Sequence, residues 1–265
     1  MAHFTYGTPP FTTTTFTSPV AGTDDVISAI NPASFTINGN GGNDSITTGS
    51  GNDTITTGSG NDTITAGDGN NTVTAGDGTN VVTTGSGNDT ITTGSGADVV
   101  NSGGGDDIIN TGAGNDIINA GSGNDTVNAG AGDDRITGGA GIDSLIGGGG
   151  HDTFVYGSLA DARTGADTIS DFSTSSPKAL GEGDVLDLTG LVHDFTGLPG
   201  HHLTLAQLVA PGWLHFSGDS SNTVISFDSN GPFAGGVTGV LVTLVGVGFS
   251  SEGHSLSAFA DNILV

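Results

Sequence analysis

A short alternation of polar and apolar residues recurs every nine positions from residue 39 to residue 155. In each copy one apolar residue, such as Ile55 or Val100, stands between two residues that are mostly Thr or Asn. This alternation predicts a short strand that buries one side chain and exposes its neighbours. Copies start at 39, 48, 57 and so on to 147, which gives thirteen copies over nearly half of the chain.

The six residues before each predicted strand are rich in glycine. The pattern is clearest at 48–56 and 57–65, which both read Thr-Gly-Ser-Gly-Asn-Asp-Thr-Ile-Thr. Position four is Gly in every copy, and position two is Gly in all copies but the first, which has Asn40. Two glycines around one residue indicate a turn that needs positive φ or a close approach of backbones. Each copy is therefore predicted to be a six-residue turn followed by a three-residue strand.

A strand with one apolar residue cannot bury it alone, but stacked copies can, which is the principle of a solenoid. Two copies make one coil, so residues eighteen apart should lie above one another. Thirteen copies give about six and a half coils, or roughly 30 Å at the usual strand spacing. The sequence thus predicts an all-β protein built on a parallel solenoid. Its core is thin, and we expect a further source of stability to offset the ordering of so many glycines.

The carboxylates at position six are the candidate source of this further stability. We expect them to form a column on each side of the stack, where like charges so close would resist folding unless they are neutralised. Carboxylate and carbonyl oxygens form the ligand set that calcium prefers, and magnesium gives up its water too reluctantly for carbonyl sites. The chain has no Cys and no column of His, which argues against zinc and softer metals. The predicted carboxylate ligands are Asp44, Asp53, Asp62, Asp89, Asp98, Asp107, Asp116, Asp125, Asp134, Asp143 and Asp152.

Glycine carbonyls at positions two and four complete the predicted ligand set. The expected calcium count is several ions, about one for each stacked pair of turns. The predicted carbonyl ligands are Gly49, Gly51, Gly58, Gly60, Gly85, Gly87, Gly94, Gly96, Gly103, Gly105, Gly112, Gly114, Gly121, Gly123, Gly130, Gly132, Gly139 and Gly141.

The pattern Gly-Gly-x-Gly-x-Asp-x-U-x, with U apolar, resembles the RTX nonapeptide repeat of calcium-binding parallel β-rolls. The resemblance covers residues 39–155. It implies a right-handed roll in which each ion lies between successive turns on one side, shared by copies eighteen residues apart. Eleven pairs of position-six residues have that spacing, and seven have Asp in both members.

Two adjacent copies depart from the pattern. They carry Asn71 and Asn80 at position six, and they carry Asp68 and Asp77 at position three, where other copies have Ser, Ala or Gly. Charge lost from position six thus reappears three residues earlier. We predict weaker or rearranged calcium sites around 66–83 in an uninterrupted stack; the alternative is drift in a tolerant turn.

The flanking regions differ in composition from the repeats. Residues 1–38 are rich in Thr and Pro, include a degraded repeat at 20–28, and are predicted to cap the roll or to form an arm that pairs with a neighbouring molecule. Residues 156–265 are predicted to be a β-rich capping and secretion domain. Its segments 167–172 and 184–188 resemble the part that closes RTX rolls, and its tail resembles an uncleaved type I export signal. We expect a short helix at 203–209 and strands within 213–227 and 237–247.

Formal net charge is −25, from 28 acidic and 3 basic residues, so no basic patch exists for nucleic acid or anionic lipid. Calcium would screen this charge and act as a folding switch. The absence of Cys fits an extracellular protein. Residues 1–19 show no signal peptide, and no segment is long enough for a membrane span. These features predict a protein that the type I machinery of a Gram-negative bacterium secretes unfolded.

No enzyme motif is present: the chain lacks His-Glu-x-x-His and Gly-x-Ser-x-Gly, and its seven His residues are scattered apart from His201-His202. The first hypothesis is a non-enzymatic, self-associating calcium scaffold that forms a surface layer, filament or matrix. The second is an ice-binding or adhesive protein that uses Thr-x-Thr rungs at 54–56, 72–74 and 90–92. The third is a small pore-forming or host-interacting RTX effector.

Overall fold

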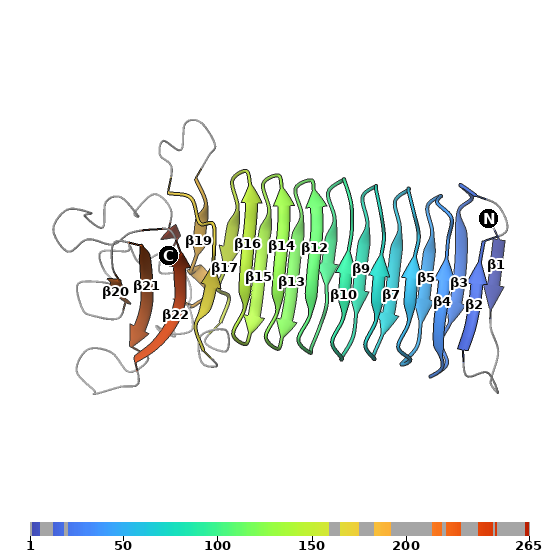
Figure 1. Ribbon diagram of the computed structural model, residues 1–265, viewed down its shortest axis with the longest axis horizontal. Helices are drawn as coiled ribbons and strands as arrows, with labels where there is room; N and C mark the ends of the chain where they lie inside the picture. The colour runs from blue at the N-terminus through green and yellow to red at the C-terminus, as the bar shows by residue number, and fades with distance from the viewer. Residues whose placement is uncertain are drawn as a thin grey trace.

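The computed structural model describes residues 2–5, 13–18, 21–158, 165–174, 183–191, 214–218, 221–228, 238–245, 247 and 263–264. These residues form an elongated stack of strands in two sheets, with almost no helix (Figure 1). The parallel solenoid of about eight turns confirms the predicted all-β fold. The predicted helix at 203–209 lies outside the described residues. Among the described residues, no helix has the length and hydropathy needed to cross a membrane.

Two sheets contain all the described strands. The first sheet has the order β1 (Ala2–Thr5), β3 (Asp25–Ala29), β5 (Ser45–Thr48), β7 (Thr63–Gly67), β9 (Val81–Thr84), β11 (Val99–Asn101), β13 (Ile117–Ser122), β15 (Arg135–Ala140), β17 (Thr153–Val155), β19 (Val185–Asp187) and β23 (Ile263–Leu264). The second has the order β2 (Thr13–Thr17), β4 (Ser34–Asn38), β6 (Thr54–Thr56), β8 (Thr72–Thr74), β10 (Thr90–Thr92), β12 (Ile108–Ala113), β14 (Thr126–Ala131), β16 (Ser144–Gly149), β18 (Asp167–Ile169), β22 (Thr238–Val245), β21 (Asn222–Asp228) and β20 (Leu214–Gly218).

Strands β5 to β17 are the thirteen repeat strands, and consecutive strands alternate between the two sheets. From β5 to β15 each strand pairs in parallel with the strand two places on, and paired residues are eighteen apart: Thr54 lies beside Thr72, which lies beside Thr90. This confirms that two copies make one coil. Since a coil returns the chain to the same sheet, every position of the repeat forms a column along the roll.

Position eight supplies the core of the roll. Its side chains point inward from both sheets and are 0–1% exposed from Ile46 to Phe154. The side chains on either side point outward, as the alternation predicts. Toward the C-terminal end the core gains aromatic residues, and the rings of Phe154 and Phe172 lie 6.0 Å apart. One large buried apolar side chain in every nine residues makes this a thin core, so the turns must contribute stability of their own.

The same two sheets extend beyond the repeats in both directions. The degraded repeat at 20–28 contains most of β3, which pairs with β5, and β4 pairs with β6, so both strands continue the sheets of the repeats. At the other end β18 pairs with β16 and β19 with β17, followed by β22 and β23. Strands β20, β21 and β22 are antiparallel, which confirms the strands expected within 213–227 and 237–247.

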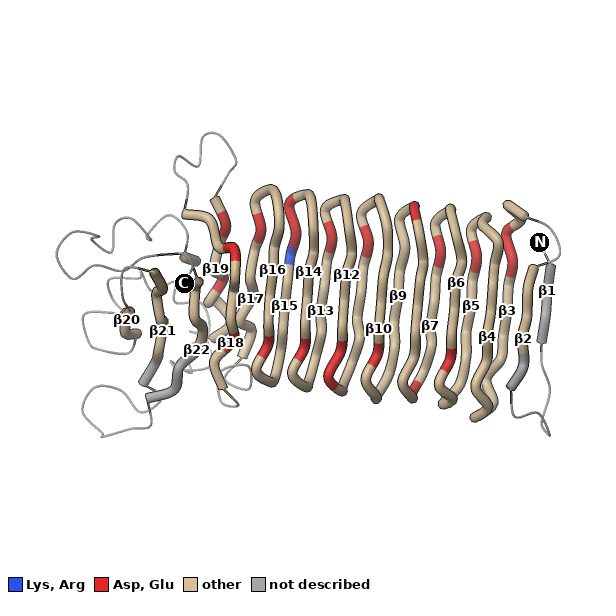
Figure 2. The backbone as a smooth tube through the Cα atoms, in the orientation of Figure 1, with Lys and Arg blue, Asp and Glu red and all other residues tan. Residues whose placement is uncertain are grey.

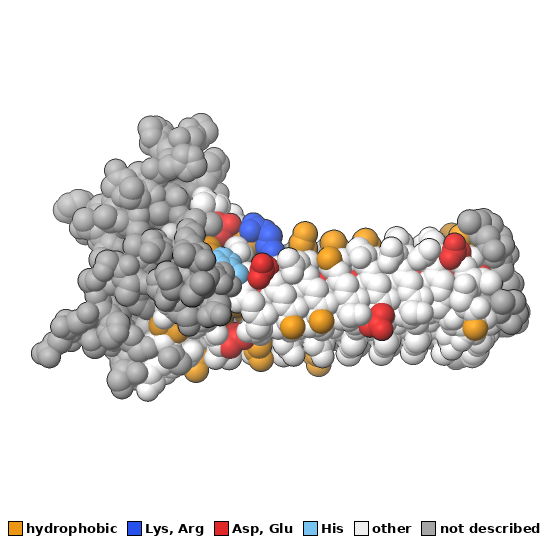
Figure 3. All heavy atoms as spheres, turned by 90° about the horizontal axis from the view of Figure 1, so that it is seen from above, with side chains coloured by type: hydrophobic (Ala, Val, Ile, Leu, Met, Phe, Trp, Pro, Cys, Tyr) orange, Lys and Arg blue, Asp and Glu red, His pale blue; other side chains and the backbone are white. Residues whose placement is uncertain are grey.

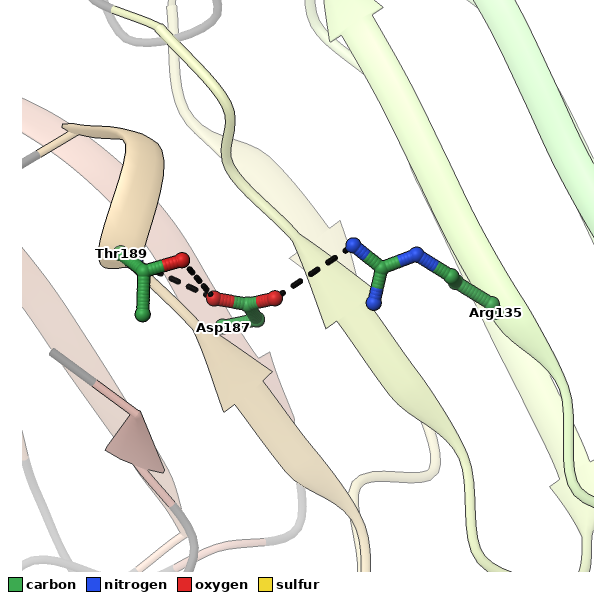
Figure 4. Close-up of polar contacts among 3 residues, drawn as sticks. All are labelled: Arg135, Asp187 and Thr189. Carbon is green, nitrogen blue, oxygen red and sulfur yellow. Dashed lines mark hydrogen bonds and ion pairs between the residues drawn. The ribbon is translucent and has the colours of Figure 1, made fainter.

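An ion pair joins the repeat roll to these added strands. The Arg135 guanidinium lies 3.4 Å from the Asp187 carboxylate, whose other oxygen accepts a hydrogen bond from the Thr189 hydroxyl at 2.7 Å (Figure 4). The arginine projects from β15 over β17 to reach β19. Because half of the Arg135 side chain is exposed, we expect this pair to contribute little to stability.

Candidate metal centre

Each turn of the roll packs directly on the turn one coil earlier. In the copy that starts at Ala129, Gly130 has φ +111° and Gly132 has φ +132°, a region that L side chains rarely adopt. A Cβ on Gly132 would collide with the carbonyl oxygen of Gly114, one coil away. The two glycines of the repeat therefore meet both expected requirements, positive φ and close approach.

The position-six carboxylates form two rows, one at each edge of the roll where the turns lie (Figure 2). They are buried: Asp62, Asp98 and Asp116 are each 1% exposed. In each row the Oδ1 atom accepts a hydrogen bond from the backbone N–H of the position-six residue one coil earlier. Asp62 Oδ1 accepts from Asp44 N at 2.8 Å, and Asp116 Oδ1 accepts from Asp98 N at 2.8 Å. One oxygen of each carboxylate thus ties successive coils together.

The other carboxylate oxygen, Oδ2, is buried and has no hydrogen-bond partner within the described part of the chain. The nearby Thr111 hydroxyl, for example, donates to the Ala129 carbonyl at 2.8 Å and leaves Asp116 Oδ2 without a proton. A buried polar atom without a partner is costly, and a charged one more so. This condition is shared by Asp44, Asp53, Asp62, Asp89, Asp98, Asp107, Asp116, Asp125, Asp134 and Asp152.

The two asparagine copies show what surrounds this second atom. Asn71 Oδ1 accepts from Asp53 N at 3.0 Å, which is the bond that Asp makes elsewhere. Its Nδ2 then donates to the carbonyl oxygens of Gly67 and Gly69, at 3.1 and 2.9 Å. Since Asn and Asp have the same shape, Oδ2 of an aspartate in this place faces the carbonyls of positions two and four.

When the carboxylate is ionised, three oxygens therefore converge in an Asp turn with no proton among them. Such a set suits a hard divalent cation, because calcium takes carboxylate and carbonyl oxygens as ligands. Among the described residues no three carboxylate, His or Cys side chains come together as a metal site, so a bound ion also needs backbone oxygens. The residues present fit calcium, and the glycines at positions two and four are the carbonyls placed to hold it.

Burial makes these carboxylates hard to ionise. Burial, with a smaller contribution from the neighbouring aspartates of each column, raises the pKa of Asp125 and of Asp134 to about 7. Burial likewise raises the pKa of Asp44 and Asp152 to about 6. In Asp116 the rise in pKa is opposed mainly by the hydrogen bond from the N–H of Asp98. A cation would favour the charged form, so calcium binding should release protons.

The columns are longer than the repeat pattern predicts. Asp25 donates its N–H to Asp44 Oδ1 at 2.9 Å, while Asp167 and Asp184 accept from the N–H groups of Asp143 and Asp152 at 2.9 and 3.0 Å. These three residues continue the position-six columns beyond both ends of the repeats. The signal was present in the sequence as Asp followed by an apolar residue two positions later, as in Asp167-Thr168-Ile169.

Position five forms a second ladder that sequence reasoning missed. Here the N–H of the later coil donates to the side-chain oxygen of the earlier one: Asn70 N to Asn52 Oδ1 at 2.9 Å, and Asn88 N to Asn70 Oδ1 at 3.0 Å. This direction is opposite to that of the buried Asp ladder. The frequent Asn at position five therefore ties coils together at the surface.

Asp68 and Asp77 lie on the exposed surface of their turns. Asp68 Oδ1 accepts from the N–H and hydroxyl of Ser86, at 2.9 and 2.7 Å, and Asp77 makes the same bonds to Ser95. These bonds lower the pKa of both carboxyls. The structure thus does not bring the relocated charge into the buried columns. The stack continues through this coil, as expected, with one irregularity: β7 and β9 pair eighteen residues apart as far as Thr65, and Gly67 then pairs with Thr84.

Comparison with known proteins identifies the repeat. The family model described as the RTX calcium-binding nonapeptide repeat (4 copies) matches residues 36–64, 56–91, 74–109, 92–127, 101–136 and 128–162. These overlapping matches cover the strands from β5 to β17 and the turns between them. A search of curated proteins returned no match.

Proposed function

The chain is an RTX repeat β-roll protein, and from this we propose that it folds on binding calcium outside the cell and serves as an extracellular structural protein. Bound calcium would supply the positive charge that neutralises the two carboxylate columns. The observation that supports this most strongly is the set of ten buried Oδ2 atoms that have no hydrogen-bond partner among the residues the structure describes.

The residues of each turn have separate tasks in this proposal. Position-six Asp ties two coils through Oδ1 and offers Oδ2 to the ion. Glycines at positions two and four bring their carbonyls close because they carry no Cβ. Without calcium, like charges repel along each column and buried oxygens lack a partner, so the folded coil is disfavoured.

The same calcium-dependent folding would explain how the chain is secreted. RTX repeats are typical of secreted proteins of Gram-negative bacteria. We infer that the type I secretion machinery carries the chain unfolded from a compartment with little free calcium. Folding on calcium outside would prevent its return and would need no disulfide, in agreement with a chain that has no Cys.

Self-association is the second part of the proposal, and an apolar column on the first sheet supports it. Val81, Val99 and Ile117 lie side by side at position seven of β9, β11 and β13, and their side chains are 40%, 38% and 52% exposed. Figure 3 shows small groups of apolar side chains on an otherwise polar roll. Since the chain carries a net charge of −25, copies should repel one another until calcium neutralises part of it.

Light-scattering mass, measured against added calcium from chelated protein, tests this proposal. We expect growth from the 25.9 kDa monomer to very large species at millimolar calcium. Val99→Thr/Ile117→Thr should weaken this growth, whereas Ile108→Thr on the second sheet should not. A compact species that stays at monomer mass would rule out assembly as the main role and leave calcium-dependent folding intact.

A threonine array on the second sheet favours ice binding as an alternative function. Thr54, Thr72 and Thr90 form one exposed column, and Thr56, Thr74 and Thr92 form another beside it. The first column continues through Thr36 of β4 and Thr15 of β2, which lengthens the array beyond the repeats. A flat sheet thus presents hydroxyl and methyl groups at regular strand spacing, about 4.8 Å.

Thermal hysteresis tests the ice-binding alternative. Thr72→Tyr should abolish it, because a large ring at the centre interrupts the flat array. Thr63→Tyr places the same ring on the exposed face of the other sheet and should leave it unchanged. Absence of hysteresis in the calcium-loaded wild-type protein would exclude this function.

A further inference from the structure

In the coil 66–83, side-chain amide groups lie in the two buried turns, where other copies have carboxylates. We propose that the side-chain amides of Asn71 and Asn80 take the place of calcium in their turns, so that the coil 66–83 holds itself together without an ion. The two copies are adjacent, so the substitution affects both edges of one coil.

Every polar atom of these two side chains is used. Asn80 Oδ1 accepts from Asp62 N at 3.0 Å, and its Nδ2 donates to the carbonyls of Gly76 and Gly78 at 3.0 and 3.2 Å. Asn71 makes the equivalent bonds to Asp53, Gly67 and Gly69. An amide nitrogen has two protons to give and no lone pair for a cation, so it satisfies the same carbonyls that an ion would bind.

The coil is also tied to its neighbours more heavily than the repeat requires. Asn71 and Asn80 donate their own N–H groups to Asp89 and Asp98 Oδ1, both at 2.7 Å, so each ladder passes through the coil unbroken. On the outer surface Asp68 and Asp77 accept two bonds each from Ser86 and Ser95. Acidic residues at position three therefore strengthen this coil from outside, which gives them a role other than calcium binding.

A self-sufficient coil has a consequence for folding. In a solenoid each coil contacts only its neighbours, so order can start at one place and spread in both directions. We place that start at 66–83, between calcium-dependent copies on its N-terminal side and the longer series on its C-terminal side. This inference rests on the proposed calcium binding, and it does not depend on self-assembly.

Ion counting on the full chain tests the first half of the inference. Native mass spectrometry in saturating calcium should find two more ions on Asn71→Asp/Asn80→Asp than on the wild type, because two turns regain a carboxylate. Asn71→Ala/Asn80→Ala should bind no more ions than the wild type. If the Asp variant binds no extra calcium, the asparagines do not displace ions and the inference is wrong. If the wild type itself binds none, the proposed function is what fails.

Hydrogen exchange in chelator tests the second half. In wild-type protein the N–H groups of Asp53, Asp62, Ser86 and Ser95 should exchange more slowly than that of Asp125. Both double variants should lose this protection in chelator, and calcium should restore it only in the Asp variant. Equal, fast exchange across all copies of the chelated wild type would overturn the claim that this coil folds without calcium.

Discussion

Asp116→Asn should make the chain more stable in chelator, and calcium should reduce or remove this advantage. Asp116 is 1% exposed, its Oδ1 accepts from Asp98 N at 2.8 Å, and its Oδ2 has no partner within the described residues. An asparagine in its place would keep the first bond. Its Nδ2 would donate to the carbonyls of Gly112 and Gly114, as Asn71 donates to the glycines of its own turn.

The two effects have comparable size and opposite sign. In chelator the substitution removes a buried acceptor without a partner, a cost of about 1–3 kcal/mol, and adds two bonds worth about 0.5–1.5 kcal/mol each. These figures predict a free energy of unfolding roughly 2–6 kcal/mol higher than that of the wild type. In calcium the wild type gains one ion that the variant cannot bind, worth about 2.7 kcal/mol at a hundredfold excess of free ion over Kd, so the difference between the two proteins should shrink by that amount.

Urea unfolding followed by circular dichroism measures both effects. The chelated samples should contain an osmolyte such as trimethylamine N-oxide, so that unfolding starts from a folded chain. Asp116→Ala is the matched control, because it removes the carboxylate without supplying an amide; we expect it to be less stable than Asp116→Asn in chelator. An asparagine variant that is less stable than wild type in chelator, or no better than the alanine variant, would refute the assigned geometry.

Three further predictions follow from the turns and the end of the roll. Without calcium, the free energy of unfolding should fall as pH rises from about 4 to about 7. The reason is that raised pKa values, as in Asp125, make the folded chain hold more protons than the unfolded chain. Urea unfolding at several pH values measures this, and a free energy of unfolding that rises with pH would contradict it. Gly132→Ala should cost at least about 1–3 kcal/mol, because φ +132° strains an alanine and its Cβ would collide with the carbonyl oxygen of Gly114. Gly149→Ala, where a Cβ meets nothing within 4 Å, should unfold like the wild type, and equal losses would argue against this account of the turn. Arg135→Met should change the free energy of unfolding by less than about 1 kcal/mol, because the ion pair is half exposed; a larger loss that persists in high salt would show that the arginine matters through packing.

The fold of residues 39–155 could be predicted because every coil has the same length. A constant period shows which residues share a column, so the core position of Ile91 and the buried column of Asp116 both follow from spacing. Beyond the repeats the interval between paired strands changes, and Asp167 of β18 pairs with Val242 of β22, 75 residues later. No period marks such a pairing, which forms because an open end of each sheet needs a strand and an apolar cover.

The sequence predicted the kind of ion that the turns suit, but it did not predict the hydrogen bonds within them. Carboxylates among glycines indicated calcium, but spacing alone could not show that one oxygen of each Asp bonds the preceding coil. Nor could it show that Asn71 turns its amide onto the carbonyls of Gly67 and Gly69. Both depend on side-chain direction within a buried turn, where the difference between an oxygen and an N–H group decides whether an ion is needed.

Small-angle X-ray scattering during a calcium titration, with bound ions counted in the same samples, tests the central claim most directly. In chelator we expect an expanded chain on both sides of the coil 66–83. With calcium we expect a compact rod about 50 Å or more in length, the span of an eleven-stranded sheet at the usual spacing. Binding of several ions together with this compaction would support the account. The same compact profile with and without calcium, and no bound ions, would contradict it.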